Sequence, residues 1–139
     1  MTIRRAMAQD APAIQATIRA VYDEYGFPWY PDSYHRDLYD FEGYYLSQNI
    51  PFWVAEHEGG VVGTTALMFH PYIEGQGVVL LDGTVRVAGT DASLERVYVH
   101  PSARRMGIAR NLNQTALEEA RARACRGIEI WSDKSFVAA

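Results

Sequence analysis

The sequence has little of what metal, disulfide or membrane proteins need: one cysteine, four histidines and no apolar run longer than four residues. Cys125 alone forms no internal disulfide or structural zinc site, and we expect it to be packed rather than nucleophilic. The histidines (His35, His57, His70 and His100) lack metal-binding spacing, so we expect no metal and place them at the surface or in loops. Short apolar runs exclude a spanning helix, and no apolar signal segment follows the N-terminus. We therefore expect a cytoplasmic protein without a membrane partner.

The length of 139 residues fits one domain, and with 48% apolar and 22% charged residues a buried core is expected, so we predict a single domain over residues 1–139. Residues 1–103 carry 6 basic and 13 acidic side chains, and residues 104–139 carry 7 basic and 4 acidic ones. This asymmetry suggests a cationic partner near the first part and an anionic partner near the second, although charges that only solvate helix faces explain it equally well. An isoelectric point near 5.5 argues against nucleic acid as a partner.

Apolar spacing, glycines and prolines predict helices interspersed among strands. Strands are expected at 2–6, 52–56, 61–69, 94–99 and 128–131, with an extra hairpin formed by 78–81 and 84–88. Helices are expected at 10–26, from near Asp32 to just before Pro51, and from 108 to about 124. This order predicts an α/β fold with a mixed, mostly antiparallel central sheet flanked by helices.

The segment 94–110 carries the clearest chemical signal. It reads as a strand ended by Pro101, a basic turn containing Gly107, and a helix. A helix N-terminus offers free N–H groups and a partial positive charge, and glycine lets a ligand approach the backbone closely. The expected ligand is an anionic phosphate group, although a helix that merely begins with arginines remains the alternative. The segment has neither a Walker loop nor the three-glycine dinucleotide motif.

This segment resembles motif A of the GCN5-related N-acetyltransferases (GNAT), Arg/Gln-x-x-Gly-x-Gly/Ala, which Arg104, Gly107 and Ala109 match. The resemblance implies an acyl-CoA N-acyltransferase-like fold with acetyl-CoA as co-substrate. It also implies that the turn amides hold the pyrophosphate, and that the preceding strand pairs with the pantetheine arm through the main chain of Val97 and Val99. The implied pyrophosphate-binding residues are Arg104, Arg105, Met106, Gly107, Ile108, Ala109 and Arg110.

Glu95 is the candidate catalytic residue. Strand alternation predicts that residues 95, 97 and 99 share one face. Acyl transfer needs a neutral amine, whereas an alkylamine with a pKa of about 10.4 is protonated at pH 7, so a nearby carboxylate that accepts the proton helps. The resemblance implies a glutamate base on this strand. The alternative, to which we give equal weight, is that Glu95 forms an ordinary ion pair with Arg96 or Arg86.

The acceptor side is indicated by composition. Residues 22–53 hold 12 of the 17 aromatic side chains, with six carboxylates against one arginine. Aromatic walls with carboxylates suit an apolar body with a cationic head, and the resemblance implies that the two N-terminal helices wall the acceptor site. Tyr45, Leu46 and Phe52 are expected to be core residues. The residues expected to line the pocket are Tyr25, Phe27, Trp29 and Tyr30.

The resemblance implies a further helix and two strands after the strand at 128–131, so we expect a C-terminally shortened member of the family. Three explanations remain open: a truncated, impaired enzyme, a homodimer that covers the open sheet edge, and Tyr98 or another tyrosine acting as the missing acid. The expected function is transfer of an acetyl group, by direct attack, to the amine of a small cationic, amphipathic acceptor. The alternative is a catalytically impaired acyl-CoA-binding or interaction module.

Overall fold

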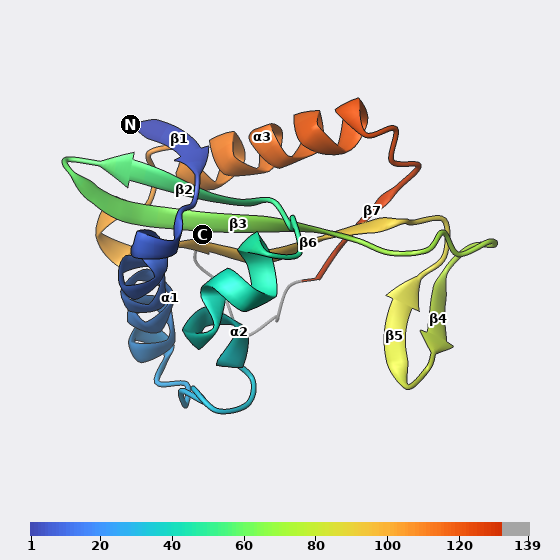
Figure 1. The fold of residues 1–139 in the computed structure, drawn as a ribbon, viewed down its shortest axis with the longest axis horizontal. Helices are drawn as coiled ribbons and strands as arrows, with labels where there is room; N and C mark the ends of the chain where they lie inside the picture. The colour runs from blue at the N-terminus through green and yellow to red at the C-terminus, as the bar shows by residue number, and fades with distance from the viewer. Residues whose placement is uncertain (132–139) are drawn as a thin grey trace.

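The computed structural model describes residues 1–131 (Figure 1). In chain order its elements are β1 (Thr2–Arg5), α1 (Ala11–Tyr25), α2 (Arg36–Tyr39), β2 (Phe52–His57), β3 (Gly60–Phe69), β4 (Val78–Leu81), β5 (Thr84–Val87), β6 (Ala92–Val99), α3 (Ile108–Ala122) and β7 (Ile128–Ile130). Short 3₁₀ turns lie at Ala8–Asp10 and Pro101–Ala103, and a π-helical turn lies at Glu42–Leu46.

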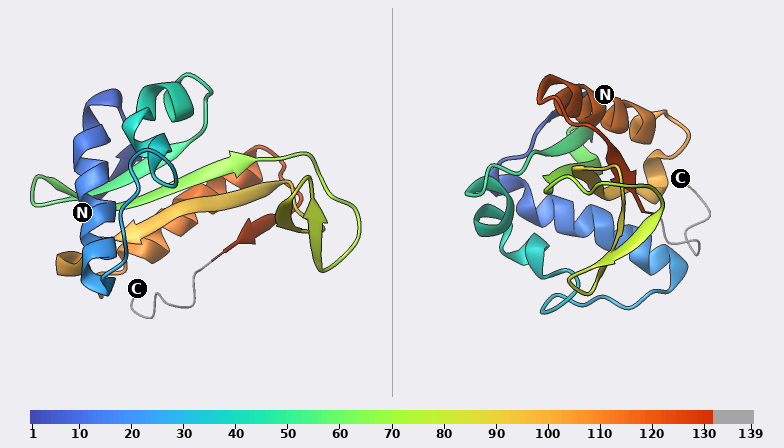
Figure 2. Two further views of the ribbon diagram at one scale, coloured as in Figure 1. Left: turned by 90° about the horizontal axis from the view of Figure 1, so that it is seen from below. Right: turned by 90° about the vertical axis from the view of Figure 1, so that its right-hand side faces the viewer.

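A five-stranded sheet with the order β1-β2-β3-β6-β7 forms the centre of the molecule. Its neighbours pair antiparallel except β6 and β7, which are parallel. Strands β4 and β5 form a separate hairpin that projects from one end of the sheet (Figure 1). Helix α3 covers one sheet face, while α1 and α2 cover the other (Figures 1 and 2). The predicted mixed, mostly antiparallel α/β architecture is confirmed.

Helix α3 packs closely on the sheet through its stripe of small and apolar residues at every fourth position, which the sequence predicts. Ile108, Leu112, Ala116 and Ala120 are all buried against β2, β3 and β6. A Cβ atom at Gly63 of β3 would lie 2.8 Å from Ile108 Cγ2 and 2.9 Å from Leu112 Cδ1. The absence of a side chain at Gly63 therefore allows α3, and the turn that precedes it, to lie close to the sheet.

The segment between α1 and β2 departs from the single helix predicted from near Asp32 to Pro51, which is wrong. Asp40 ends α2 with φ −123° and ψ 50°, and its carboxylate fills the space that Gly43 leaves open. The π-helical turn then places Tyr45 in the core, 4.8 Å between ring centroids from Phe52. Packing of aromatic rings against the sheet thus overrides the local helical pattern.

Strand β6 contains a bulge at Arg96, which lies in the left-handed region at φ 52°. Ala66 of β3 faces Glu95, yet Thr64 faces Tyr98, so β6 has one extra residue. Consequently Glu95 and Tyr98 line one cavity on the α2 side, whereas Val99 packs toward α3, and Val97 packs against the same α3-side cluster while also bordering the cavity. The predicted common face for residues 95, 97 and 99 is wrong, because the bulge interrupts the alternation.

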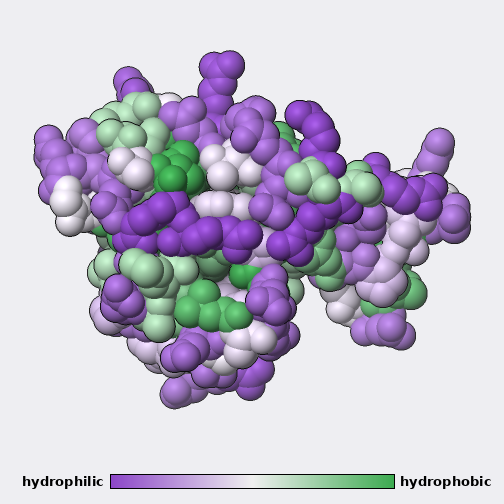
Figure 3. Space-filling model, turned by 45° about the horizontal axis from the view of Figure 1, so that its top comes forward, coloured by the Kyte–Doolittle hydropathy of each residue, from purple (hydrophilic) through white to green (hydrophobic). Residues whose placement is uncertain are grey.

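Most of the α3 face is hydrophilic in the space-filling view, and the β4–β5 hairpin protrudes from the body (Figure 3). Among residues 1–131, no helix combines the length and the apolar character needed to cross a membrane.

Candidate functional site

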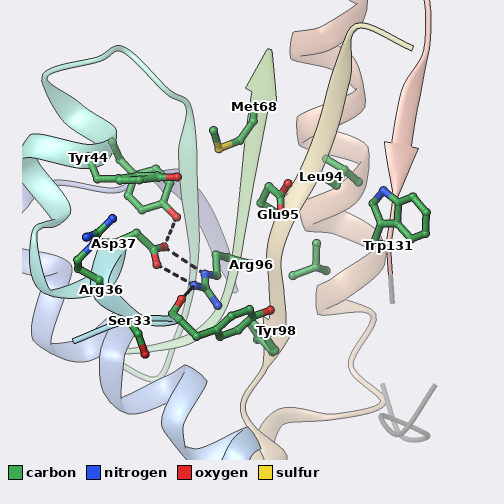
Figure 4. A pocket seen from close by; sticks show the side chains of 13 residues that line it. Ser33, Arg36, Asp37, Tyr44, Met68, Leu94, Glu95, Arg96, Tyr98 and Trp131 are labelled. Carbon is green, nitrogen blue, oxygen red and sulfur yellow. Dashed lines mark hydrogen bonds and ion pairs between the residues drawn. The ribbon is translucent and has the colours of Figure 1, made fainter. Parts of the chain in front are cut away.

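A cavity of about 480 Å³ lies between α2, the π-helical turn and the bulged part of β6 (Figure 4). Its lining includes carboxylates, arginines and aromatic rings from these three elements and from the end of β7. Among them are Asp37, Glu95, Arg36, Arg96, Tyr34, Tyr44, Tyr45, Tyr98 and Trp131. Carboxylates beside aromatic faces favour a cationic guest.

An ion pair between Arg96 and Asp37 joins the bulge to α2. Arg96 Nη2 lies 2.7 Å from Asp37 Oδ1, and its Nε lies 3.1 Å from Oδ2. The same guanidinium donates to the Tyr34 carbonyl at 2.6 Å, and the Tyr45 hydroxyl donates to Asp37. Burial and the Asp37 carboxylate raise the pKa of Tyr45 above its ordinary value. One wall of the cavity is therefore rigid, and its arginine and aspartate neutralise each other.

Glu95 is exposed to the cavity and accepts a hydrogen bond from Ser93 Oγ at 3.0 Å. The alternative that Glu95 pairs with Arg96 or Arg86 is not realised within residues 1–131, because Arg96 binds Asp37 and Arg86 binds Glu129. The carboxylate is thus available to a cavity ligand.

Tyr98 points into the same cavity and carries a hydroxyl 3.3 Å from that of Tyr22 on α1. Burial raises the pKa of Tyr98, so its phenol stays protonated at neutral pH. Tyr44 also has a raised pKa because of burial and the nearby carboxylates of Asp37 and Glu95. A protonated phenol and an accessible carboxylate thus face one space.

The basic turn after β6 leaves its backbone open. Gly107 has φ 73°, and no described atom would lie within 4 Å of a Cβ there. The first helical hydrogen bond of α3 runs from Asn111 N–H to Gly107 C=O at 3.1 Å. The N–H groups of Ile108, Ala109 and Arg110 therefore have no acceptor within the helix, and they suit an anion.

The side chains of this turn differ in their exposure and in their ion pairing. Arg105, Met106 and Arg110 are exposed, whereas Ile108 is buried and offers only its main chain. Arg104 instead binds Glu24 near the end of α1, with Nη2 2.5 Å from Oε1 and Nη1 2.6 Å from Oε2. This pair raises the pKa of Arg104 and ties the turn to α1.

The four residues expected to line the acceptor pocket lie outside this cavity. Phe27 and Trp29 pack against the core around α1, and Tyr25 stacks on Phe27 with ring centroids 5.5 Å apart. Tyr30 is 50% exposed. The cavity draws its aromatic residues from positions 34, 44, 45, 98 and 131 instead. The acidic and aromatic stretch contributes Tyr34, Asp37, Tyr44 and Tyr45 to the cavity, but not the four residues that its composition led us to expect there.

His35 lies in the turn before α2, in agreement with the expected surface or loop position, but it is fully buried rather than at the surface. Its Nδ1 accepts from Tyr30 N–H at 3.1 Å, and its ring stacks on Trp29 at 3.8 Å. Burial, helped by the charge of Arg96, lowers the pKa of His35 to about 4. Within residues 1–131, no three or more His, Cys, Asp or Glu side chains are grouped as metal ligands.

The Acetyltransferase (GNAT) family model matches residues 17–139. A curated Escherichia coli (strain K12) protein, the "Uncharacterized N-acetyltransferase YjgM", is 32% identical over 124 residues, which are 86% of this chain. This chain spans 64% of that relative's length.

Solved structures show the same fold. An acetyltransferase of the GNAT family from Staphylococcus aureus Mu50 superposes with a TM-score of 0.77 at 17% identity, over 98% of this chain and 76% of that one. A "predicted acetyltransferase with acetyl-CoA" from Clostridium acetobutylicum superposes with a TM-score of 0.67 at 18% identity, over 96% and 81% of the two chains. With its family match, its bulged sheet and its open turn before α3, this chain belongs to the GNAT acetyltransferase family.

Proposed function

We propose that this chain transfers an acetyl group from acetyl-CoA to the amine of a small cationic, amphipathic acceptor. One observation carries the proposal: β6 joins a cavity containing Glu95 and Tyr98 directly to the open turn at Gly107. A proton acceptor and an anion-binding helix N-terminus are thereby fixed on one strand-turn-helix unit. The family match and a structural neighbour solved with acetyl-CoA support this assignment.

The coenzyme would bind along β6 and the turn. Strand β7 pairs only with Ala92–Leu94, so the later part of β6 has no partner on that side among residues 1–131. The main chain of Val97 and Val99 is the proposed partner of the pantetheine arm. The N–H groups at the start of α3, with the charges of Arg105 and Arg110, are the proposed seat of the pyrophosphate.

The reaction follows from these positions. Glu95 takes one proton from the acceptor ammonium, and the neutral amine attacks the thioester carbonyl. The C–N bond forms as the C–S bond breaks, and the leaving thiolate takes a proton from Tyr98. The surplus proton on the amide nitrogen returns to the tyrosinate through solvent, and Glu95 releases its proton to solvent. The main-chain N–H near Val97 is the proposed donor to the developing oxyanion.

The test is thiol release from acetyl-CoA across a panel of amines, with Glu95→Gln as the variant. We expect amine-dependent release that falls about 100-fold or more in Glu95→Gln, while calorimetry shows unchanged acetyl-CoA affinity. Saturable binding without release for any amine would favour the alternative, a catalytically impaired acyl-CoA-binding module. Absence of both binding and release would contradict the two together.

We also propose a homodimer that covers the outer edge of β7. That edge pairs with no strand in the described part of the chain, and exposed strand edges tend to pair with other chains.

A further inference from the structure

A chain of three polar side chains leads from the end of β3 to Glu95. His70 Nε2 lies 2.8 Å from Ser93 Oγ, and Ser93 Oγ lies 3.0 Å from Glu95 Oε1. Ser93 is 1% exposed, and His70 is half-buried. His70 N–H also donates to the Asp91 carbonyl at 2.8 Å, which fixes the backbone that carries the imidazole.

The chemistry of these groups sets the direction of the chain. An ionised carboxylate only accepts, so the one hydroxyl hydrogen of Ser93 is donated to Glu95. Ser93 Oγ must then accept from His70, which therefore carries a hydrogen on Nε2. Burial, followed by the charge of Arg86, lowers the pKa of His70, so the ring is neutral at pH 7. Both hydrogen bonds thus point toward the carboxylate.

The charges around the chain are largely paired. Near His70 these are Arg86 of β5 and Glu129 of β7, which bind each other. Around the cavity Arg96 binds Asp37, leaving Arg36 and the phenols of Tyr44 and Tyr98 as the other groups near Glu95. Ser93 is therefore a neutral donor to Glu95, and Arg36 is the remaining cation that lines the cavity.

We propose that His70 and Ser93 are positioning residues for Glu95, acting together to hold its carboxylate turned toward the acceptor amine. This inference rests on the proposed transferase function. Neither residue touches the reacting atoms: the imidazole fixes the Ser93 hydroxyl, and the hydroxyl fixes Glu95. Loss of either hydrogen bond leaves the Glu95 carboxylate free to rotate away from that direction.

The experiment compares His70→Leu, Ser93→Ala and His70→Gln with the parent chain. Gln carries an amide N–H close to the place of the imidazole Nε2, so it can restore the donor that Leu removes. His57→Leu is the matched control, because His57 lies on β2 away from the cavity. One readout is the ¹⁵N NMR spectrum of the His70 ring, assigned by its loss in His70→Leu, which shows which ring nitrogen carries the hydrogen. The other is kcat and KM for thiol release between pH 5 and 9.

We expect the His70 ring of the parent chain to carry its hydrogen on Nε2, and we expect Ser93→Ala to remove this preference. We also expect His70→Leu and Ser93→Ala to lower kcat about tenfold while KM for acetyl-CoA is unchanged. His70→Gln restores kcat, and His57→Leu changes neither the His70 ring nor kcat. Thermal unfolding identifies a variant that fails to fold. If either Ser93→Ala or His70→Leu fails, the other variant supplies the test.

A hydrogen on Nδ1 of His70 in the parent chain would overturn the inference, as would an unchanged kcat in both His70→Leu and Ser93→Ala, or His70→Gln behaving like His70→Leu. Failure of the proposed function looks different, because the parent chain then releases no thiol with any amine. In that case the hydrogen position on His70 alone decides whether the chain of hydrogen bonds to Glu95 exists.

Discussion

The imidazole of His35 lies between aromatic rings that exclude water from it. Trp29 stacks on one face, and the Tyr22 ring meets it edge-on with ring centroids 4.5 Å apart. Nδ1 has a donor in Tyr30 N–H, whereas Nε2 is buried without a hydrogen-bond partner in the described part of the chain. A proton added to this ring would place a charge in an apolar site near Arg96, which explains the low pKa of His35.

This residue predicts an acid-sensitive fold. The folded pKa of about 4 lies below the ordinary value of 6.5, so the unfolded chain binds a proton first as the pH falls. The free energy of unfolding should fall between pH 6.5 and 4, by up to about 3 kcal/mol, and this contribution should be constant above pH 7. Urea unfolding at several pH values measures it. His35→Phe should remove this part of the pH dependence, and His57→Leu should keep it. An identical pH slope in His35→Phe would contradict the argument.

At the scale of elements, the turn before α3 joins the sheet to the proposed coenzyme site. Gly107 has left-handed backbone and open space above it, while Ile108 anchors the first turn of the helix in the core. The first turn of α3 is thus anchored to the core through Ile108, while the space beside Gly107 stays open to a ligand, as an anion site requires.

We predict that Gly107→Glu abolishes acetyl-CoA binding without unfolding the chain, because a carboxylate enters the space proposed for the pyrophosphate. Gly59→Glu is the matched control: Gly59 also has positive φ, at 82°, and open surroundings, but lies in the β2–β3 turn. Both changes should cost similar backbone strain, about 1 kcal/mol. Calorimetry should show binding to Gly59→Glu only. Comparable binding to both variants would place the coenzyme elsewhere.

Elements fixed by local signals could be predicted from the sequence. The stripe from Ile108 to Ala120, Gly26 after α1 and the hairpin around Asp82 and Gly83 all lie where the sequence predicts them. Each depends on neighbours within a few positions along the chain. The anion site proposed at residues 104–110 likewise rests on the sequence of that segment alone, and it remains a prediction.

The cavity could not be predicted in the same way, because distant residues build it. Arg96 adopts a backbone conformation typical of glycine, and its support comes from Asp37 and from Thr64, whose hydroxyl donates to the Arg96 carbonyl at 2.7 Å. The burial of His35 likewise depends on rings from two other segments. Alternation along β6 could not reveal a bulge stabilised by partners tens of residues away.

For the whole molecule, two of the places where the described chain exposes apolar side chains lie on strands. One is the end of β7, where Ile130 is 62% exposed and Trp131 is 51% exposed. The other is the projecting β4–β5 hairpin (Figure 1), where Val78 is 68% exposed and Leu80 is 72% exposed. The first adjoins an unpaired backbone edge, whereas the second consists of side chains on a two-stranded ribbon.

These surfaces make the proposed homodimer testable. Edge pairing satisfies backbone hydrogen bonds as well as covering apolar side chains, so we predict that two copies meet along β7. Ile130→Lys should shift the protein toward monomer, since lysine on an edge strand opposes pairing, while Leu80→Lys should leave the dimer intact. Sedimentation velocity over a range of concentrations measures both. A dimer broken by Leu80→Lys alone would assign the interface to the hairpin, and a parent chain monomeric at every concentration would contradict association altogether.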